Sequence, residues 1–387
     1  MRFVATCKLG LESTVGISLR KLGIESYETL DARVLFDGDF SDMARALLWL
    51  RTAERLLLTV GTFKATSFDE LFEKTKALDW KPYLRPSNKI HVNGKSAKST
   101  LFSVSDCQSI VKKAIVENLK SAYRTDTIPE NGPEVIVEVG ILKDEVTIAL
   151  DCCGAGLSRR GYRTYNVAAP LSETLGAGMV MLSRFFPDTP LIDPMCGSGT
   201  IPIEAAMIAN HIAPSRGRSF ASENWQFLPK DVFQIAREQA RDEEKHEKLL
   251  ILGSDIDARC IDLCKKHAKK AGVMLQWKIC DLKDFSTDWE KGVILCNPPY
   301  GERMLEQKEV NRLYHLMRQK FDQYPDWEKN IITARKDFEA VYGKKADKRR
   351  KLSNGGMTCT VYRYFAQREK TFAKQDASDG VSSDNEL

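Results

Sequence analysis

The spacing of apolar and polar positions predicts a chain of alternating strands and helices. Up to residue 60, and again from 61 to 157, short apolar strands alternate with amphipathic stretches, which indicates two small α/β modules. Either Asp39 or Ser41 is expected to cap the helix that follows it. The expected strands lie at 2–6, 34–36, 89–93, 135–139 and 145–150, and the expected helices at 11–22, 40–50 and 105–120.

The pattern changes near residue 158. From there to residue 367, strongly apolar strands alternate with helices, which is typical of a doubly wound parallel sheet. These strands are expected at 190–193, 249–254, 275–280 and 292–296, with a charged helix at 230–248. The remaining residues are polar and lack apolar periodicity, so we expect a disordered tail. The predicted domains and tail therefore lie at 1–60, 61–157, 158–367 and 368–387.

Composition is consistent with a globular protein of two or three domains. The chain has 387 residues, of which 43% are hydrophobic and 29% charged. Its net charge of +5 permits a nucleic-acid partner without requiring one. No apolar stretch approaches the roughly 20 residues that span a bilayer. The first residues lack the apolar region of a signal peptide.

Ten cysteines are scattered along the chain without the spacing of a metal site. Cys152 and Cys153 are adjacent, and Cys260 and Cys264 lie one helical turn apart. No pair of C-x-x-C elements and no His-rich segment accompanies them, so we expect no zinc or other metal. Buried free thiols indicate a reducing compartment, and we therefore expect the protein in the cytoplasm.

Candidate ligand-binding residues occur where four strands of the third domain end. In open α/β sheets, ligands bind at the carboxyl ends of the strands. Candidate residues at the ends of four successive strands favour a binding site over four unrelated turns. In strand order, the residues are Asp193 with the glycine turn of Gly197 and Gly199, then Asp255, Asp281 and the tetrad Asn297-Pro298-Pro299-Tyr300.

Taken singly, two of these features have an ordinary structural alternative. The glycine turn lacks the third glycine of a dinucleotide fingerprint and the Lys-Ser/Thr of a phosphate loop. It is either a ligand loop at a helix N-terminus or a simple tight turn. A carboxylate at Asp255 suits the two hydroxyls of a ribose. Helix capping is the alternative for Asp255 or Asp257.

The tetrad that follows the strand at 292–296 restricts the backbone strongly. Neither proline offers an N–H donor and both fix φ, so the chain leaves the sheet and stiffens at once. Asn297 then presents an amide and Tyr300 an aromatic ring at the strand end. This pair suits a planar substrate that bears an amino group. A proline-rich turn beside a core tyrosine is the alternative.

Together these motifs resemble those of S-adenosylmethionine-dependent methyltransferases that act on exocyclic amines. The closer resemblance is to the THUMP-containing RNA guanine methyltransferases, which modify the 2-amino group of guanine in large-subunit (23S) ribosomal RNA. Residues 5–12 resemble the ferredoxin-like start of that family, 91–120 its THUMP module, and 162–163 with 168–175 the segment that leads into the cofactor site. The resemblance implies an α/β protein with a Rossmann-like class I methyltransferase domain behind ferredoxin-like and THUMP α/β domains.

The resemblance also implies roles for individual residues. The Asn297 oxygen and the Pro298 carbonyl would accept hydrogen bonds from the amine, and Tyr300 would stack on the base. The sulfonium methyl group is already activated, so the protein must chiefly orient the amine. The implied S-adenosylmethionine ligands are Gly197 and Gly199 for the methionine end, Asp255 for the ribose, Asp281 for the adenine, and Arg163, Pro170, Glu173, Asp193 and Thr200 nearby.

Basic residues supply candidate RNA contacts. In the second domain, a solvated helix face is the alternative to RNA binding, but the resemblance favours RNA. Arg216 and Arg218, in a long insertion between the first two strands, either meet phosphate or lie in a plain surface loop. The basic run 344–351 either meets phosphate or forms a flexible hairpin tip. The expected RNA-binding residues of the second domain are Lys89, Lys95, Lys98, Lys112 and Lys113.

Two other functions remain open from the sequence. The acceptor is alternatively another RNA such as tRNA, adenine in DNA or a protein glutamine, because the tetrad serves planar amines and amides in general. The second alternative is a non-catalytic RNA-binding assembly factor. Retention of Gly197, Gly199, Asp255 and Asn297 argues against this alternative.

Overall fold

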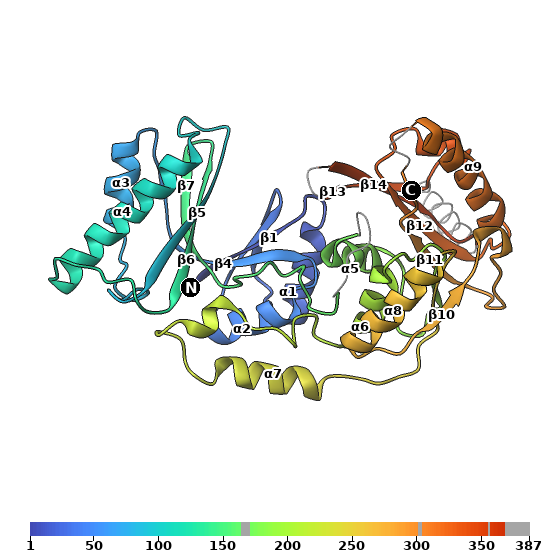
Figure 1. Cartoon of the computed structure of the whole chain (residues 1–387), viewed down its shortest axis with the longest axis horizontal. Helices are drawn as coiled ribbons and strands as arrows, with labels where there is room; N and C mark the ends of the chain where they lie inside the picture. Colours follow the sequence, from blue (N-terminus) through green and yellow to red (C-terminus); the bar gives the residue numbers. More distant parts are fainter. Residues whose placement is uncertain (164–170, 301–303, 355–356, 368–387) are drawn as a thin grey trace, which may run out of the picture. The chain divides into compact units, whose positions relative to one another are not determined.

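The computed structural model describes residues 1–163, 171–300, 304–354 and 357–367. Internal contacts divide the chain into two compact units (Figure 1). The first unit consists of residues 1–7, 15–159 and 214–242, and the second contains residues 8–14, 160–213 and the chain from 243. The expected tail at 368–387 and Pro170 lie outside the described residues.

The first unit is built on one sheet of seven described strands. Its order is β2-β3-β1-β4-β7-β6-β5, with β5 and β6 parallel and the other pairs antiparallel. The strands are β1 (Arg2–Cys7), β2 (Tyr27–Leu30), β3 (Arg33–Asp37), β4 (Ala53–Lys64), β5 (Lys89–Ala97), β6 (Glu134–Leu142) and β7 (Glu145–Asp151).

The long strand β4 joins the two expected N-terminal modules. Its first half pairs with β1 and its second half with β7, so a single hydrogen-bonded sheet runs through both. The expected boundary at residues 60 and 61 therefore falls inside β4. The first six of its twelve residues are buried or half-buried, and the last six are half-buried or exposed.

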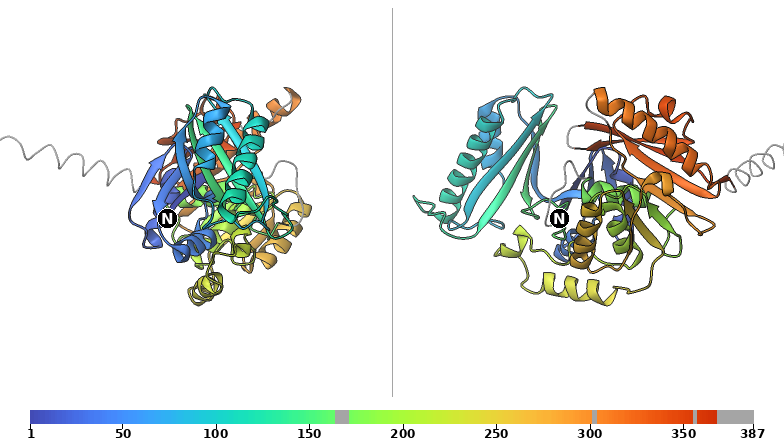
Figure 2. Two further views of the ribbon diagram at one scale, coloured as in Figure 1. Left: turned by 90° about the vertical axis from the view of Figure 1, so that its left-hand side faces the viewer. Right: turned by 45° about the vertical axis from the view of Figure 1, so that its right-hand side comes forward.

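Helices cover this sheet, and α3 and α4 lie side by side along the part formed by β5, β6 and β7 (Figures 1 and 2). Asp39 caps α2 by accepting a hydrogen bond from the Asp42 N–H at 2.9 Å, which decides between the two expected caps. The helices of this unit are α1 (Glu12–Lys21), α2 (Phe40–Trp49), α3 (Phe68–Lys76), α4 (Val104–Tyr123), the 3-10 turn η1 (Ala221–Asn224) and α7 (Val232–Asp242). The first residues of α1 are grouped with the second unit.

The insertion at 214–242 packs with the first unit, although it lies inside the sequence range expected for the third domain. Its Arg218 guanidinium donates hydrogen bonds to the carbonyls of Ala155 and Gly156. Phe227 stacks on Trp225 at 5.1 Å and meets the Tyr83 ring edge-on at 5.5 Å. Carbonyl contacts and aromatic packing therefore fix the insertion to its neighbours, and α7 ends at Asp242, earlier than the expected 248.

The second unit contains the predicted doubly wound sheet. The order of its seven described strands is β10-β9-β8-β11-β12-β14-β13, parallel from β10 to β12, with β14 antiparallel to both of its neighbours. The strands are β8 (Leu191–Asp193), β9 (Ile251–Asp255), β10 (Gln276–Ile279), β11 (Gly292–Cys296), β12 (Trp327–Thr333), β13 (Lys348–Asn354) and β14 (Met357–Tyr364).

Alternate strand residues build a core on each face of this sheet. Leu191 and Val293 pack among residues of α5, α6 and α8, whereas Ile192 and Ile294 pack among residues of α9 and α10. Burial on both faces explains why β8 and β11 read as continuous apolar runs. The helices are α5 (Glu173–Leu182), α6 (Thr200–Ala209), α8 (Ala258–Ala271), the 3-10 turn η2 (Leu282–Asp284), α9 (Met304–Phe321) and α10 (Phe338–Tyr342).

None of the helices among the described residues is long and apolar enough to cross a membrane. The basic run at 344–351 ends in β13, an edge strand, so its second half is an extended strand rather than a hairpin tip. Within it, Arg350 donates hydrogen bonds to the Gly10 carbonyl at 2.7 Å and to Ser13 Oγ at 2.9 Å. Arg349 pairs with Glu339 at 2.6 Å, so two of these cations are engaged internally.

Candidate active site and cofactor loop

Four neighbouring parallel strands bring the expected site residues to one edge of the second sheet. Strands β10, β9, β8 and β11 are adjacent and point the same way, so their carboxyl ends meet. Asp193 and Asp255 are the last residues of β8 and β9. Asp281 follows β10, and Asn297 follows β11 directly. The structure therefore places the four strand-end residues along one edge, as the sequence predicted.

The glycine turn after β8 forms a tight loop at the start of α6. Gly199 has φ +80°, stands at the N-cap and has no side chain to cap the helix, so the first turn of α6 offers backbone N–H groups. Gly197 has φ +52°, and a Cβ built on it would meet no atom of the described part of the chain within 4 Å. The loop thus has space on the Gly197 side for a ligand to approach the backbone.

Asp255 braces this loop from the next strand. One carboxylate oxygen accepts the Gly197 N–H at 2.9 Å and the other accepts the Asp257 N–H at 3.0 Å. Each oxygen keeps a second lone pair for a further donor. Asp257 is the residue that caps α8, since it accepts the Arg259 N–H at 2.9 Å. The two acidic residues therefore divide the roles that the sequence left open, and Asp255 is the one held beside the loop.

Asp193 and Asp281 lie in contrasting environments. The Asp193 side chain is buried and accepts the Met195 N–H at 3.2 Å, and burial raises its pKa well above the usual range for a carboxyl. Asp281 caps η2 by accepting the Lys283 N–H at 3.0 Å. That hydrogen bond lowers the pKa of Asp281, so it is a carboxylate at neutral pH. Asp281 is therefore a charged acceptor, and Asp193 a buried structural one.

Arg163, Glu173 and Thr200 meet beside the first turn of α6. Arg163 Nη2 donates to Thr200 Oγ1 at 2.6 Å and to the Leu171 carbonyl at 2.7 Å. Its Nε lies 3.6 Å from Glu173 Oε1. Burial raises the pKa of Glu173, opposed by the neighbouring Arg163. A guanidinium and a helix N-terminus together provide positive potential next to the loop, which favours an anionic group such as a carboxylate.

The tetrad after β11 closes on itself. The Tyr300 hydroxyl donates a hydrogen bond to Asn297 Oδ1 at 2.5 Å. The Tyr314 hydroxyl donates to the Pro299 carbonyl at 3.0 Å and also lies 3.2 Å from Thr333 Oγ1. Burial raises the pKa of the Tyr300 phenol far above its usual value, so the hydroxyl remains a donor at neutral pH. Hydrogen bonds from two tyrosines thus also stabilise the proline-containing segment after β11, which the sequence predicted to be rigid.

Sequence patterns did not reveal several supporting residues. Tyr314 lies on α9, and nothing in its local sequence marks it as a partner of the tetrad. Tyr162 donates to Glu204 Oε1 at 3.1 Å, and Arg160 Nε lies 3.4 Å from the same oxygen, so a buried network stands behind α6. A polar Glu204 among the apolar positions of α6 was the one available signal.

The lysines expected to contact RNA do not form one continuous cluster. Lys89 and Lys95 stand at the first and seventh positions of β5, about 20 Å apart at the rise of a strand. Lys112 pairs with Glu130 at 2.9 Å, and Lys113 lies over the Phe72 ring. In the described part of the chain, Lys95 and Lys98 form no ion pair and are exposed. Lys95 and Lys98 are therefore the best placed of the set to meet phosphate.

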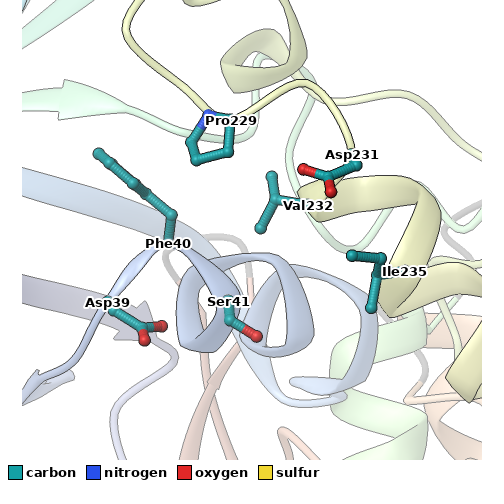
Figure 3. Close-up of a pocket in the computed structure, with 7 residues that line it drawn as sticks. All are labelled: Asp39, Phe40, Ser41, Pro229, Asp231, Val232 and Ile235. Atoms are coloured by element: carbon teal, nitrogen blue, oxygen red, sulfur yellow. The ribbon is translucent and has the colours of Figure 1, made fainter.

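A surface pocket of about 300 Å³ lies in the first unit, between the start of α2 and the start of α7 (Figure 3). Phe40, Pro229, Val232 and Ile235 give it apolar walls. The carboxylate of Asp39 at its rim is already used as the cap of α2. None of the expected site residues lines this pocket, so the strand ends of the second unit remain the candidate site.

The strand-end residues fit S-adenosylmethionine chemically. Open space beside Gly197 admits a ligand to the backbone, and the Asp255 carboxylate retains acceptor capacity for two hydroxyls. Arg163 and the start of α6 favour a carboxylate, and the Asp281 carboxylate can accept from an amino group. These are the groups that the amino acid, ribose and adenine parts of the cofactor require.

Family models match three successive parts of the chain. A model described as RMKL-like, methyltransferase domain, matches residues 160–363, more than half of the chain. A THUMP domain matches residues 65–151, and an RlmL ferredoxin-like domain matches residues 2–57. The chain belongs to the RMKL-like methyltransferase family. It combines a Rossmann-like class I methyltransferase domain, whose cofactor is S-adenosylmethionine, with ferredoxin-like and RNA-binding THUMP domains.

Relatives of this RMKL-like methyltransferase cover nearly its whole length. "Putative RNA methyltransferase YpsC" of Bacillus subtilis is 46% identical over 377 residues, 95% of this chain and 98% of the relative. The crystal structure of "SMU.472, a putative methyltransferase complexed with SAH" is 40% identical, with a TM-score of 0.90 over 95% of this chain and 98% of that one. A "predicted N6-adenine-specific DNA methylase" from Listeria monocytogenes is 47% identical, with a TM-score of 0.89 over 94% and 96%. These descriptions agree on methyl transfer and differ on the acceptor.

Proposed function

We propose that this protein methylates the exocyclic 2-amino group of a guanine in 23S ribosomal RNA, in the cytoplasm. The observation that carries the proposal is the position of Asn297, an amide on a proline-stiffened exit at the sheet edge that also holds the glycine loop. The THUMP domain and the relative described as an RNA methyltransferase support RNA as the substrate. All ten cysteines are free thiols, which is consistent with a reducing compartment.

Asn297 and Pro298 would orient the amine. A guanine 2-amino group is a poor nucleophile because its lone pair is delocalised into the ring. Asn297 Oδ1 already accepts one hydrogen bond from Tyr300, which leaves one lone pair for an amine N–H. The Pro298 carbonyl would accept the second N–H. Two acceptors favour a tetrahedral nitrogen and stabilise the positive charge that develops on it.

The cofactor, when bound, supplies an activated methyl group on a sulfonium. The chain's contribution is to align the amine lone pair with that group and to exclude competing orientations. Asp255 and the glycine loop would fix one partner, and the tetrad would fix the other. A target base has to leave its stack to reach such a site, so an unpaired or weakly paired guanine is the expected target.

Methyl transfer from labelled S-adenosylmethionine, followed by nucleoside analysis, tests the proposal. Undermodified ribosomal RNA, tRNA and duplex DNA would serve as parallel substrates. We expect N2-methylguanosine from ribosomal RNA alone, and loss of at least about 100-fold in rate for Asn297→Ala, in line with the removal of one oxyanion-hole donor in other enzymes. Label on tRNA or on adenine in DNA would show that the acceptor differs from the proposed guanine of 23S ribosomal RNA. Full activity of Asn297→Ala would overturn the proposed mechanism.

A further inference from the structure

The glycine loop after β8 is held from behind by two side chains of α8. Cys264 Sγ donates to the Gly197 carbonyl at 3.2 Å, and His267 Nδ1 lies 3.0 Å from the Ser198 carbonyl. Residues three apart lie on the same face of a helix, so both side chains reach the loop together. Both are fully buried. Two consecutive loop carbonyls are therefore each bound to a donor from one helix.

The Ser198 carbonyl decides the state of the His267 ring. A carbonyl only accepts, so Nδ1 carries the proton and donates it. Among the described residues, Nε2 is buried without a hydrogen-bond partner, and burial lowers the pKa of His267. The ring is therefore neutral at neutral pH, with its one N–H directed at the loop.

The thiol of Cys264 has a comparable arrangement. Its Sγ lies 3.8 Å from Cys196 Sγ, so when Cys264 donates to Gly197, Cys196 can donate to Cys264 in turn. A thiol is a weak donor, and this bond is expected to contribute less than the histidine bond. The loop also rests directly on this side chain, because a Cβ added at Gly199 would come within 3.0 Å of Cys264 Sγ.

These bonds set the direction of the loop's peptide groups. In a trans peptide, the N–H points opposite to the carbonyl of the same unit. With the Gly197 carbonyl bound to α8, the Ser198 N–H is turned away from α8. The Gly199 N–H closes the turn onto the Cys196 carbonyl at 2.8 Å, so the loop is fixed at both of its inner peptide units.

We propose that Cys264 and His267 are positioning residues for cofactor binding, because their hydrogen bonds to Gly197 and Ser198 hold the loop in the orientation that binds S-adenosylmethionine. They act through the loop and do not touch the cofactor. The inference depends on the cofactor and not on the acceptor, so it stands or falls independently of guanine methylation.

Binding of S-adenosylhomocysteine, measured by calorimetry on the purified full chain, tests the inference. A lost hydrogen bond of about 0.5–1.5 kcal/mol corresponds to about 2- to 13-fold in affinity. We expect the dissociation constant to rise about 10-fold in His267→Leu and about 3-fold in Cys264→Ala. Cys260→Ala, one turn earlier on the same helix and half-exposed, is the matched control and should bind like the wild type.

Conservative variants separate positioning from general stability. His267→Asn places an amide N–H near the position of Nδ1, and Cys264→Ser keeps a donor at the same position. If the donor is what matters, His267→Asn should bind within about 3-fold of the wild type and Cys264→Ser should bind like the wild type. Melting temperatures without ligand report structural damage, which would appear without a matching change in affinity.

Three outcomes would overturn the inference. The first is wild-type affinity in folded His267→Leu and Cys264→Ala. The second is a loss of more than about 10-fold in folded His267→Asn and Cys264→Ser, because it would show that the donor is not what counts. The third is a lower melting temperature with unchanged affinity. If RNA is not methylated but these affinities change as expected, the proposed acceptor fails and the positioning role stands.

Discussion

The Tyr300 hydroxyl donates a hydrogen bond of 2.5 Å to the side-chain oxygen of Asn297, three residues earlier. This bond fixes the orientation of the Asn297 amide and leaves one lone pair on its oxygen for a further hydrogen bond. It also gives Tyr300 a role besides the stacking that the sequence suggests. Within the tetrad, the ring and the amide are therefore one coupled unit rather than two separate contacts.

Tyr300→Phe separates the two roles of this tyrosine. The ring remains for stacking, but the hydrogen bond to Asn297 is lost. We expect kcat to fall about 3- to 10-fold, the equivalent of one hydrogen bond, with little change in KM for the nucleic acid. Tyr300→Ala should lose stacking as well, worth about 1–3 kcal/mol. Steady-state kinetics on the methyl acceptor would measure both, and a Phe variant with wild-type kcat would exclude the positioning role.

Substitution of Asp255 should weaken cofactor binding, whereas substitution of Asp257 should lower stability. Asp255→Asn replaces an acceptor of the Gly197 or Asp257 N–H by an amide donor, so S-adenosylhomocysteine should bind about 10- to 100-fold more weakly. Asp257→Ala removes the cap of α8 and should cost about 1 kcal/mol of stability with little change in affinity. Calorimetry and thermal melts on the two variants form a matched pair. Equal affinity losses would contradict the division of roles.

The buried carboxyl of Asp193 should make the stability of the fold depend on pH. Because burial raises its pKa in the folded protein, the fold retains a proton that the unfolded chain releases near pH 4. The stability from this group is thus present at acidic pH and lost as pH rises through the raised folded pKa. Asp193→Asn carries no charge to bury, so its melting temperature relative to the wild type should increase as the pH rises from about 4 toward neutral.

Thermal melts across this range check the effect, with Asp188→Asn, a substitution at an exposed position, as the control. A difference between Asp193→Asn and wild type that is constant with pH would contradict a buried, proton-binding Asp193. Binding of S-adenosylhomocysteine measured alongside would report whether the same carboxyl also contributes to the cofactor site.

Gly199→Ala should disturb the cofactor loop. Its φ of +80° strains an L-residue, and the added Cβ would lie 2.9 Å from the Trp277 ring and 3.0 Å from Cys264 Sγ. We expect a loss of about 1–3 kcal/mol of stability together with weaker binding of S-adenosylhomocysteine. Gly217→Ala, where a Cβ would meet no atom within 4 Å, is the control. Chemical denaturation would detect the difference, and equal stabilities would argue against a tightly packed loop.

Lys95 and Lys98 should contribute more to RNA binding than Lys112 does. Lys112 is already paired with Glu130, whereas Lys95 and Lys98 are exposed. For each phosphate contact removed, the slope of log affinity against log salt should fall by about 1. Binding of ribosomal RNA by Lys95→Ala, Lys98→Ala and Lys112→Ala at several salt concentrations measures this. A larger slope change for Lys112→Ala would reverse the assignment.

The candidate site illustrates how far sequence patterns reach. Asp193, Asp255, Asp281 and Asn297 could be grouped from the sequence because parallel strands end at the same edge of a sheet. Which of Asp255 and Asp257 caps α8 could not be predicted, because both precede this helix and only the backbone geometry decides between them. The sequence likewise offered no sign that α9 secures the tetrad through Tyr314.

The lysines and the insertion show a second limit. A run of basic residues appears as one cluster in the sequence, but an extended strand separates Lys89 from Lys95 by about 20 Å. The insertion at 214–242 lies between β8 and β9 in the chain, yet it packs with the first unit. Long-range packing of aromatic side chains such as Phe227 decides this, and no local pattern encodes it.

The sequence by itself determined the class of fold, the positions of the main strands along the chain and the residues at their ends. Local periodicity and the fixed φ of proline suffice for these, because each depends on neighbours along the chain. Only the tertiary structure decided the partners of those residues: Tyr300 for Asn297, Gly197 for Asp255, and Cys264 and His267 behind the loop. Asp255 lies 58 residues from Gly197 in sequence, and His267 lies 69 from Ser198. Contacts of this range exist only once both faces of the sheet are packed.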